Sequence, residues 1–276
     1  MSRPLVRYHG GKWKLAPWII SRFPEHRIYV EPYGGGGSVL LRKERSYAEI
    51  YNDLDGEICN LFRVARDCGD ALVRACELTP FARDEFVLSY EPSADTLEQA
   101  RRTLARSFMG FGSAAASRKA TGFRANSNRS GTTPAHDWGN YPKALEATVD
   151  RLRGVVIENR DALEVMAQQD SLETLFYVDP PYVSSTRDKG SDYLHEMTDR
   201  DHFALLSFLC DLKGMVVLSG YENPLYTEYL ADWPSESMFA MADGAQPRKE
   251  VLWFNPAAMN ALLKANGQLS LLEEFA

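Results

Sequence analysis

Residues 27–38 read RIYVEPYGGGGS, a short apolar run that passes directly into four consecutive glycines. The apolar part predicts a β-strand, and the segment after the glycines predicts the start of a helix. Glycine permits a tight turn and lets the backbone approach a ligand without a Cβ atom in the way. After the first strand of an α/β sheet, such a turn is typical of a nucleotide-type cofactor site. A purely structural turn fits equally well, whereas a P-loop is excluded because no Gly-Lys-Ser/Thr follows.

Strand and helix signals alternate along most of the chain. Apolar runs predict strands at residues 27–31, 48–52, 155–158, 175–178 and 215–218, and helical patterns follow the first four of them at 37–43, 55–67, 163–168 and 200–212. Thr198 and Asp201 form a helix N-cap pair in this pattern. Residues 237–241 and 250–254 predict an antiparallel hairpin at the sheet edge. The sequence therefore predicts an α/β fold, with a parallel sheet covered by helices on both faces.

The alternation is broken between the second and third predicted strands. Helix-like stretches at 71–77 and 96–108 are followed by a segment at 110–139 that is rich in Gly, Ser, Ala, Thr and Asn. A loop of that length inside a compact domain is usually functional. We therefore expect residues 69–150 to form an inserted, mostly helical subdomain, and residues 1–68 and 151–276 to form the main domain.

Composition limits the class of protein. The chain has 276 residues, of which 45% are hydrophobic and 25% charged, as in globular proteins. Its net charge of −7 argues against nucleic-acid binding through charge over the whole surface. The four cysteines contain no C-x-x-C pair, so neither a zinc site nor a disulfide framework is expected. With no apolar run of membrane-spanning length and no signal core, the default expectation is a soluble, reduced, cytoplasmic protein without a metal.

Charge is strongly segregated along the chain. Residues 99–136 contain no Asp or Glu but seven basic residues, which are Arg101, Arg102, Arg106, Arg118, Lys119, Arg124 and Arg129. This segregation fits a polyanion-binding face on an otherwise acidic protein. On charge alone, a solvated helix face next to a loop fits as well. The small residues between the cations favour a loop that fits against phosphates.

Two acidic motifs follow predicted strands. Asp53 ends the second strand, about 20 residues after the glycines, where an acid can bind both ribose hydroxyls of a cofactor. A helix N-cap is the alternative reading. Asp179-Pro180-Pro181-Tyr182 follows the strand at 175–178. Because Pro-Pro stiffens this turn, the carboxylate, the Pro180 carbonyl and the tyrosine ring are held together. Two acceptors beside a flat ring suit a planar group that bears an NH₂.

The motifs and their order resemble those of the Dam-like, alpha-type adenine-specific DNA methyltransferases of bacteria and phages. Asp-Pro-Pro-Tyr is the catalytic motif of that family. The segment Tyr8-His9-Gly10-Gly11-Lys12 resembles its first cofactor motif, with Tyr8 where Dam typically has tryptophan. The glycine turn, the insert and the catalytic motif follow in the family's order. Motif by motif, the resemblance extends from Tyr8 to about Asn255.

The resemblance implies a Rossmann-like methyltransferase fold and S-adenosyl-L-methionine as the cofactor. It implies a cofactor site built from the N-terminal motif, the glycine turn and the acids after the strands: Tyr8, Gly11, Lys12, Glu31, Pro32, Gly34, Gly36, Ser38, Asp53, Asp161 and Asp179. Asp179, Pro180, Pro181 and Tyr182 would be the catalytic residues. The adenine amine is a poor nucleophile because its lone pair is delocalised into the ring. Acceptance of its two hydrogens by Asp179 and Pro180 would restore that lone pair, while Tyr182 stacks on the flipped base.

The expected partner is double-stranded DNA, with no membrane and no obligatory protein partner evident. In the insert, the candidate DNA contacts are Arg118, Lys119, Arg124, Asn126 and Arg129, because Arg pairs with guanine and Asn with adenine. Arg124 and Asn126 resemble the recognition loop of Dam, which makes GATC a candidate target. For a phage-encoded protein, the location would be the host cytoplasm.

Other functions remain open at this point. A cytosine-amino DNA methyltransferase usually carries Ser-Pro-Pro-Tyr, so Asp179 favours adenine. Protein-glutamine methyltransferases use Asn-Pro-Pro-Tyr and have little need of a basic insert. A catalytically silent DNA-binding relative would not need Lys12, Asp53 and Asp179 together. A dehydrogenase would explain the glycines but not Asp-Pro-Pro-Tyr.

Overall fold

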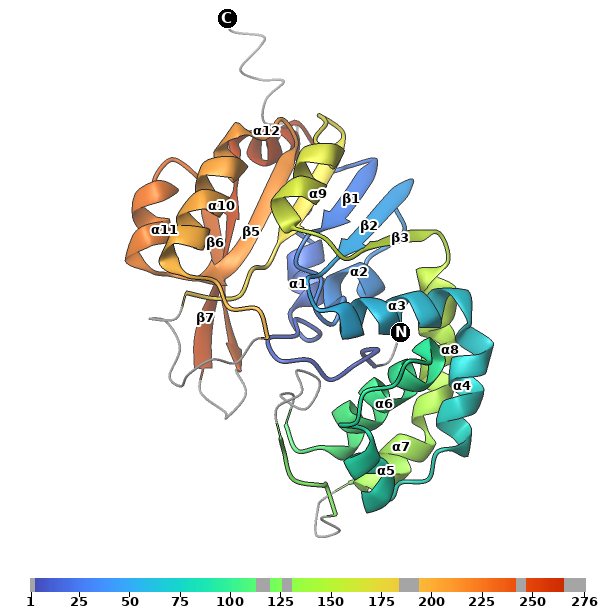
Figure 1. Ribbon diagram of the computed structural model, residues 1–276. Coiled ribbons are helices and arrows are strands. Elements are labelled where there is room, and N and C mark those ends of the chain that lie inside the picture. The colour runs from blue at the N-terminus through green and yellow to red at the C-terminus, as the bar shows by residue number, and fades with distance from the viewer. Residues whose placement is uncertain (1–2, 113–119, 126–130, 184–193, 242–246, 266–276) are drawn as a thin grey trace, which may run out of the picture.

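The centre of the protein is a mostly parallel sheet. The computed structural model describes residues 3–112, 120–125, 131–183, 194–241 and 247–265. Within these residues the sheet has seven strands in the order β3-β2-β1-β4-β5-β7-β6 (Figure 1). The strands are β1 (Ile28–Glu31), β2 (Ala48–Asn52), β3 (Val155–Glu158), β4 (Thr174–Val178), β5 (Met215–Tyr221), β6 (Ser235–Met241) and β7 (Pro247–Phe254). Strands β1 to β5 pair in parallel, and β7 is antiparallel to both β5 and β6. The prediction of an α/β fold with an edge hairpin is confirmed.

Helices connect the strands and extend the fold on one side. They are α1 (Ala16–Ile20), α2 (Ser38–Arg42), α3 (Gly56–Asp67), α4 (Gly69–Leu78), α5 (Arg83–Leu88), α6 (Thr96–Met109), α7 (Pro134–Gly139), α8 (Tyr141–Leu152), α9 (Ala162–Gln169), α10 (Asp199–Asp211), α11 (Pro224–Tyr229) and α12 (Pro256–Ala265). In the described part of the chain, none of these helices combines the length and apolar character needed to cross a bilayer.

The two faces of the sheet carry separate hydrophobic cores because side chains alternate along each strand. On β4, Leu175 and Tyr177 point into the core that contains α1, α2, α3 and α12. Phe176 and Val178, between and after them, point into the core that contains α9, α10 and α11. All five residues of β4 are buried, as expected for a strand covered on both faces. The carboxyl ends of the parallel strands remain available for a ligand site.

Helices α4 to α8 gather on one side of the molecule, next to α3 (Figure 1). Their buried residues, such as Leu104 and Leu145, belong to the same hydrophobic cluster as Phe62 of α3 and Tyr51 of β2. The inserted helices therefore pack on the main domain through a continuous core, with α3 between the two.

The sequence located most elements to within a few residues. Strands β2 and β3 have the predicted bounds, and β5 continues three residues beyond its predicted end, to Tyr221. The predicted cap of α10 is a full capping box, in which the side chains of Thr198 and Asp201 each accept from the other's backbone N–H. Helices α1, α5, α7, α8, α11 and α12 were not predicted. Four of them have only five or six residues, too few to show a helical period.

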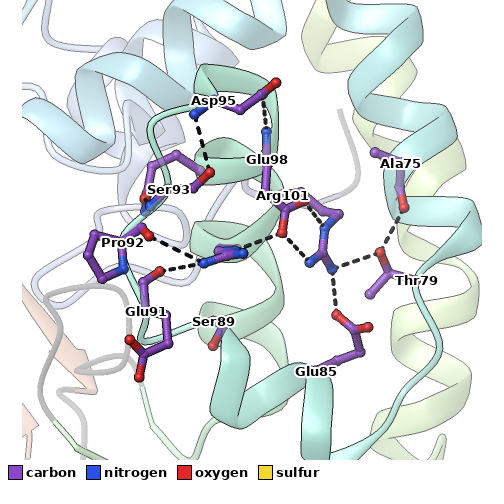
Figure 2. Close-up of polar contacts among 12 residues, drawn as sticks. Ala75, Thr79, Glu85, Ser89, Glu91, Pro92, Ser93, Asp95, Glu98 and Arg101 are labelled. Atoms are coloured by element: carbon purple, nitrogen blue, oxygen red, sulfur yellow. Dashed lines mark hydrogen bonds and ion pairs between the residues drawn. The ribbon is translucent and has the colours of Figure 1, made fainter.

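The cations that begin the acid-free stretch are neutralised inside the helical region, contrary to the expected open cationic face. Arg101 lies 2.7 Å from Glu85 and 2.7 Å from Glu98, and Arg102 lies 2.7 Å from the other oxygen of Glu98 (Figure 2). These two arginines hold the pKa of Glu98 down to about 2. The stretch without acids begins one residue after Glu98. The charge count for that stretch therefore included Arg101 and Arg102 but left out the acid that pairs with them.

Arg106 is also neutralised, by an acid of the main domain. Its side chain is 1% exposed, and its guanidinium lies 2.5 Å from Glu57 on the first turn of α3. The same guanidinium donates to the backbone carbonyl of Ser89. Arg101, Arg102 and Arg106 therefore stabilise the helical region and do not face a polyanion.

Candidate active site

A cavity of about 400 Å³ lies at the carboxyl end of the parallel strands, where ligands of α/β proteins bind. Segments that follow β1, β2, β3 and β4 contribute to its wall together with the N-terminal segment. The eleven residues predicted for a cofactor all line it: Tyr8, Gly11, Lys12, Glu31, Pro32, Gly34, Gly36, Ser38, Asp53, Asp161 and Asp179. The fold thus brings together residues that are spread over 172 positions of the sequence.

The glycine turn after β1 is closely packed against β2. The backbone N–H of Gly34 donates to the carbonyl of Asn52 over 2.7 Å. Gly35 and Gly37 have φ angles of 49° and 60°, in the left-handed region that favours glycine. A Cβ atom at Gly34 would lie within 2.8 Å of three carbon atoms of the buried Tyr51 ring. Glycine is therefore required in this turn for both backbone conformation and space.

Replacement of Gly34 by alanine is expected to lower the free energy of unfolding by about 1–3 kcal/mol, because the new methyl group collides with a ring that is packed in the core. The displaced turn should also weaken ligand binding in the cavity. Thermal melting and calorimetric titration would measure the two effects. Gly139→Ala is the matched control, since a Cβ atom there meets no heavy atom within 4 Å. Equal melting temperatures for the two variants would contradict the prediction.

Asp53 presents its carboxylate to the cavity and is not the cap of α3. Its two oxygens accept from the backbone N–H groups of Gly35 and Asp55, each over 2.8 Å. The N-cap is Asp55, whose side chain accepts from Glu57 N–H. Burial raises the pKa of Asp53 to about 6. Asp161, in contrast, has both roles. It lines the cavity, and its side chain caps α9 by accepting hydrogen bonds from the backbone N–H groups of Leu163 and Glu164.

Glu31 is a second buried acid of the cavity, and it is 2% exposed. Its Oε1 accepts from the Tyr29 hydroxyl and from Leu40 N–H, each over 2.6 Å. Burial raises the pKa of Glu31 to about 7, although these hydrogen bonds act in the opposite direction. The cavity therefore favours a ligand that carries positive charge or donates hydrogen bonds.

The Asp179-Pro180-Pro181-Tyr182 turn follows β4 at the inner end of the cavity. Asp179 Oδ1 lies 3.0 Å from Lys12 Nζ. Burial raises the pKa of Asp179 to about 6, and the ammonium group of Lys12 limits the increase. Pro181 lines the cavity beside Asp179. The carboxylate that the sequence assigns to chemistry is therefore half-buried, adjacent to a cation and open to a ligand.

The Tyr182 ring is held on several sides. It meets the Tyr221 ring edge-on, with centroids 4.4 Å apart. Its hydroxyl donates to Glu250 over 2.5 Å and is also hydrogen-bonded to Lys12. Glu250 had no predicted role, because it lies 68 residues further along the chain, on β7.

Other cavity residues also escaped prediction. Tyr33, Tyr177, His195, Glu196, Met197 and Asp201 contribute to the wall. His195 had no predicted role, and no motif around it signals that it meets the cavity. Residues 194–197 precede α10, so this wall comes from a connection rather than from a regular element.

The predicted DNA contacts are only partly described. Arg118, Lys119, Asn126 and Arg129 lie outside the described residues. Arg124 is 9% exposed, and its guanidinium donates to the carbonyl of Phe108 near the end of α6. Its backbone N–H also donates to Met109. In this arrangement Arg124 joins the segment at 120–125 to α6.

The strand order, with an antiparallel β7 between β5 and β6, and the cavity at the carboxyl ends define a Rossmann-like methyltransferase fold. The family model of the D12 class N6 adenine-specific DNA methyltransferases matches residues 8–241. The chain therefore belongs to this family and is an adenine-specific DNA methyltransferase.

Individual relatives agree with this family. The chain is 26% identical over 261 residues to the type II methyltransferase M1.LlaDCHI of Lactococcus lactis subsp. cremoris, which covers 84% of this chain and 85% of the relative. It is 31% identical over 108 residues to a DNA adenine methylase of Serratia marcescens, covering 37% and 39% of the two chains. A DNA adenine methylase of Haemophilus influenzae is 30% identical over 83 residues, 30% and 29% of the two chains.

Proposed function

We propose that the protein transfers a methyl group from S-adenosyl-L-methionine to the exocyclic amine of adenine at a short, specific site in duplex DNA. The observation that carries this proposal is the shared cavity of the glycine turn, Asp53 and Asp179. One cavity thereby joins a nucleotide-type cofactor site to the turn that carries Asp179 and Pro181. A cytosine-amino enzyme would use the same cavity, but the family match favours adenine.

The residues of the cavity fit the proposed cofactor. Gly34, Gly35 and Gly36 line the cavity and present backbone without side chains to a ligand. Asp53 is placed to accept hydrogen bonds from ribose hydroxyls, and Tyr8 offers a flat surface. The cofactor would supply an activated methyl group beside its positive sulfur. The acidic lining of Glu31, Asp53 and Asp179 suits that charge.

Asp179 and Pro180 are the proposed acceptors for the two hydrogens of the adenine amine. When both hydrogens are held, the nitrogen lone pair is less delocalised and can accept a methyl group. Asp179 must be ionised for this purpose, and its pKa of about 6 allows that at neutral pH. Its carboxylate can also receive the proton that the methylated amine releases. Tyr182 is the proposed stacking partner of the base, because its ring is fixed beside Tyr221.

The base must leave the duplex to reach a cavity of this kind, at a cost of a few kcal/mol. We propose that the insert offsets this cost through contacts with DNA. Arg118, Lys119, Asn126 and Arg129 remain the proposed contact residues. For Arg124, the contact with Phe108 supports a role in holding the segment at 120–125 on α6. GATC remains a candidate target.

The test is mass spectrometry of nucleosides from unmethylated duplex DNA that has been incubated with the protein and S-adenosyl-L-methionine. Methylated deoxyadenosine is the expected product, and mapping of the modified sites would identify the target. Methylated deoxycytidine would overturn the choice of base. Absence of any methylated base, with cofactor binding measured separately, would contradict the proposed reaction on DNA.

Cofactor affinity is expected to increase with pH between 5.5 and 7.5. Burial raises the pKa of Asp53 to about 6 and that of Glu31 to about 7, so both acids are largely neutral at the lower limit. A cationic ligand binds more tightly when these acids are ionised. Over this range the ionised fraction rises about fourfold for a pKa near 6 and more than about tenfold for a pKa near 7, so the dissociation constant should fall about tenfold. Calorimetric titration would measure it.

The control for this pH dependence is Asp53→Asn, whose side chain does not titrate. It should bind more weakly and show a flatter dependence on pH. A dissociation constant of the unmodified protein that stays constant over this range would show that the buried acids do not govern cofactor binding.

A further inference from the structure

Glu250 is a buried acid for which the reaction proposed above has no assigned use. It lies on β7, opposite Tyr221 of β5, and is 3% exposed. Its Oε1 accepts from Ser219 Oγ over 2.7 Å and from the Tyr182 hydroxyl over 2.5 Å. Ser219 therefore fixes the carboxylate from β5, and the carboxylate in turn fixes the catalytic motif.

Lys12 connects Glu250 to Asp179. Its ammonium nitrogen lies 3.5 Å from Glu250 Oε1 and 3.0 Å from Asp179 Oδ1, and it also meets the Tyr182 hydroxyl. The nitrogen lies 4.6 Å from the centroid of the Tyr182 ring. One cation is thus shared between two buried carboxylates, and the tyrosine lies against all three groups.

This cluster carries one positive and two negative charges when its acids are ionised. An unpaired charge is costly in a buried site, so the excess negative charge calls for a compensating cation. The adenine amine acquires positive charge as it is methylated, directly beside Asp179. A preorganised charge of the opposite sign stabilises such a state without reorganisation.

We propose that Glu250 is a positioning residue for methyl transfer: it holds the Tyr182 ring and shares the Lys12 ammonium group with Asp179, which weakens the pairing of Lys12 with the carboxylate that accepts the adenine amine. The proposal rests on the function proposed above. Without the Glu250 charge, Lys12 pairs with Asp179 alone and competes with the amine for the same oxygen. Tyr182 also loses its charged acceptor.

The test is Glu250→Gln, which keeps the shape of the side chain and removes its charge. We expect the single-turnover rate of methylation at pH 7.5 to fall at least about tenfold, because a preorganised electrostatic contact is lost. Cofactor dissociation constants should stay within about threefold, since Glu250 does not line the cofactor cavity. Glu236→Gln is the matched control on the neighbouring strand, where the acid is exposed and pairs with Arg22.

A pH profile distinguishes positioning from simple loss of structure. The acidic limb of the rate profile reports ionisation of Asp179. Three charged groups and three hydroxyls act on that carboxylate. They are Lys12 of the N-terminal segment, Glu31 of β1, Glu250 of β7, and the hydroxyls of Tyr177, Tyr182 and Tyr226. The negative charge of Glu250 raises the pKa of Asp179. In Glu250→Gln the limb should therefore move to lower pH even though the maximal rate falls.

A double-mutant cycle with Tyr182→Phe provides a second measurement. If Glu250 acts through the Tyr182 hydroxyl, the combined variant should be less impaired than the product of the two single effects. If Glu250→Gln methylates DNA at a rate within threefold of the unmodified enzyme, this inference is overturned and the proposed function still stands. A limb that stays at its original pH, or parallel loss of cofactor binding and folding, would overturn it as well. Absence of methylation by the unmodified enzyme would overturn the proposed function and this inference with it.

Discussion

Replacement of Asp179 by alanine should reduce the single-turnover rate of adenine methylation by at least about 1,000-fold, because one side chain supplies both an acceptor for the amine and a charge beside it. The carboxylate lies in the wall of the cavity, 3.0 Å from Lys12. No other described acid lies on the same turn, so the remaining Pro180 carbonyl would hold only one of the two amine hydrogens. Radiolabel transfer from the cofactor to duplex DNA, measured with enzyme in excess, gives this rate.

The fold should survive this change. Lys12 keeps a partner in Glu250, 3.5 Å away, so the variant does not leave an isolated buried cation. DNA binding should remain close to normal, because Asp179 lies in the cavity wall and the proposed DNA contacts lie in the insert. Asp211→Ala, at the exposed end of α10, is the control for loss of one acid. Turnover within tenfold of normal in Asp179→Ala would show that the carboxylate is not the essential acceptor.

Replacement of Arg106 by methionine should lower the free energy of unfolding by about 3–5 kcal/mol, the usual effect of removing one partner of a buried ion pair. Arg106 is 1% exposed, and the Glu57 side chain is 13% exposed. The substitution leaves the Glu57 carboxylate without its cation and removes the donor to the Ser89 carbonyl. Urea titration followed by circular dichroism would measure the change.

Two further variants separate the charge effect from the loss of packing. Adding Glu57→Gln to Arg106→Met removes the isolated charge and should restore part of the lost stability. Arg74→Met breaks an exposed pair with Glu77 and should cost less than about 1 kcal/mol. If Arg74→Met and Arg106→Met lower the free energy of unfolding equally, the buried ion pair contributes no more to stability than the exposed one.

Local patterns predicted the elements that position the site. Buried apolar runs gave β1 to β5 to within a few residues, because strands covered on both faces read as continuous hydrophobic segments. The glycine turn, Asp53 and the Asp179 motif each follow such a strand, so their common edge could be inferred before the structure. The order β3-β2-β1-β4-β5 brings these turns together.

Contacts between distant segments could not be predicted in this way. Glu250 reaches Tyr182 across a register between β5 and β7 that no local pattern specifies. His195 meets the cavity from an irregular connection. Arg106 and Glu57 are 49 residues apart, and the charge map separated them. A count of charges along the chain does not reveal which charges are paired in space, so the pairing of Arg101, Arg102 and Arg106 with acids could not be predicted.

Helix α3 has a consequence for how target specificity can change during evolution. Its first turn follows Asp53 at the cofactor cavity, and the same turn carries Glu57, the partner of Arg106. Its buried face packs in the core shared with α6 and α8. The helical insert is therefore not a cassette that can be exchanged at residue 69. A recombinant that acquires new helices in place of α4 to α8 needs an α3 that matches them, so the helical region and this wall of the cavity are inherited together.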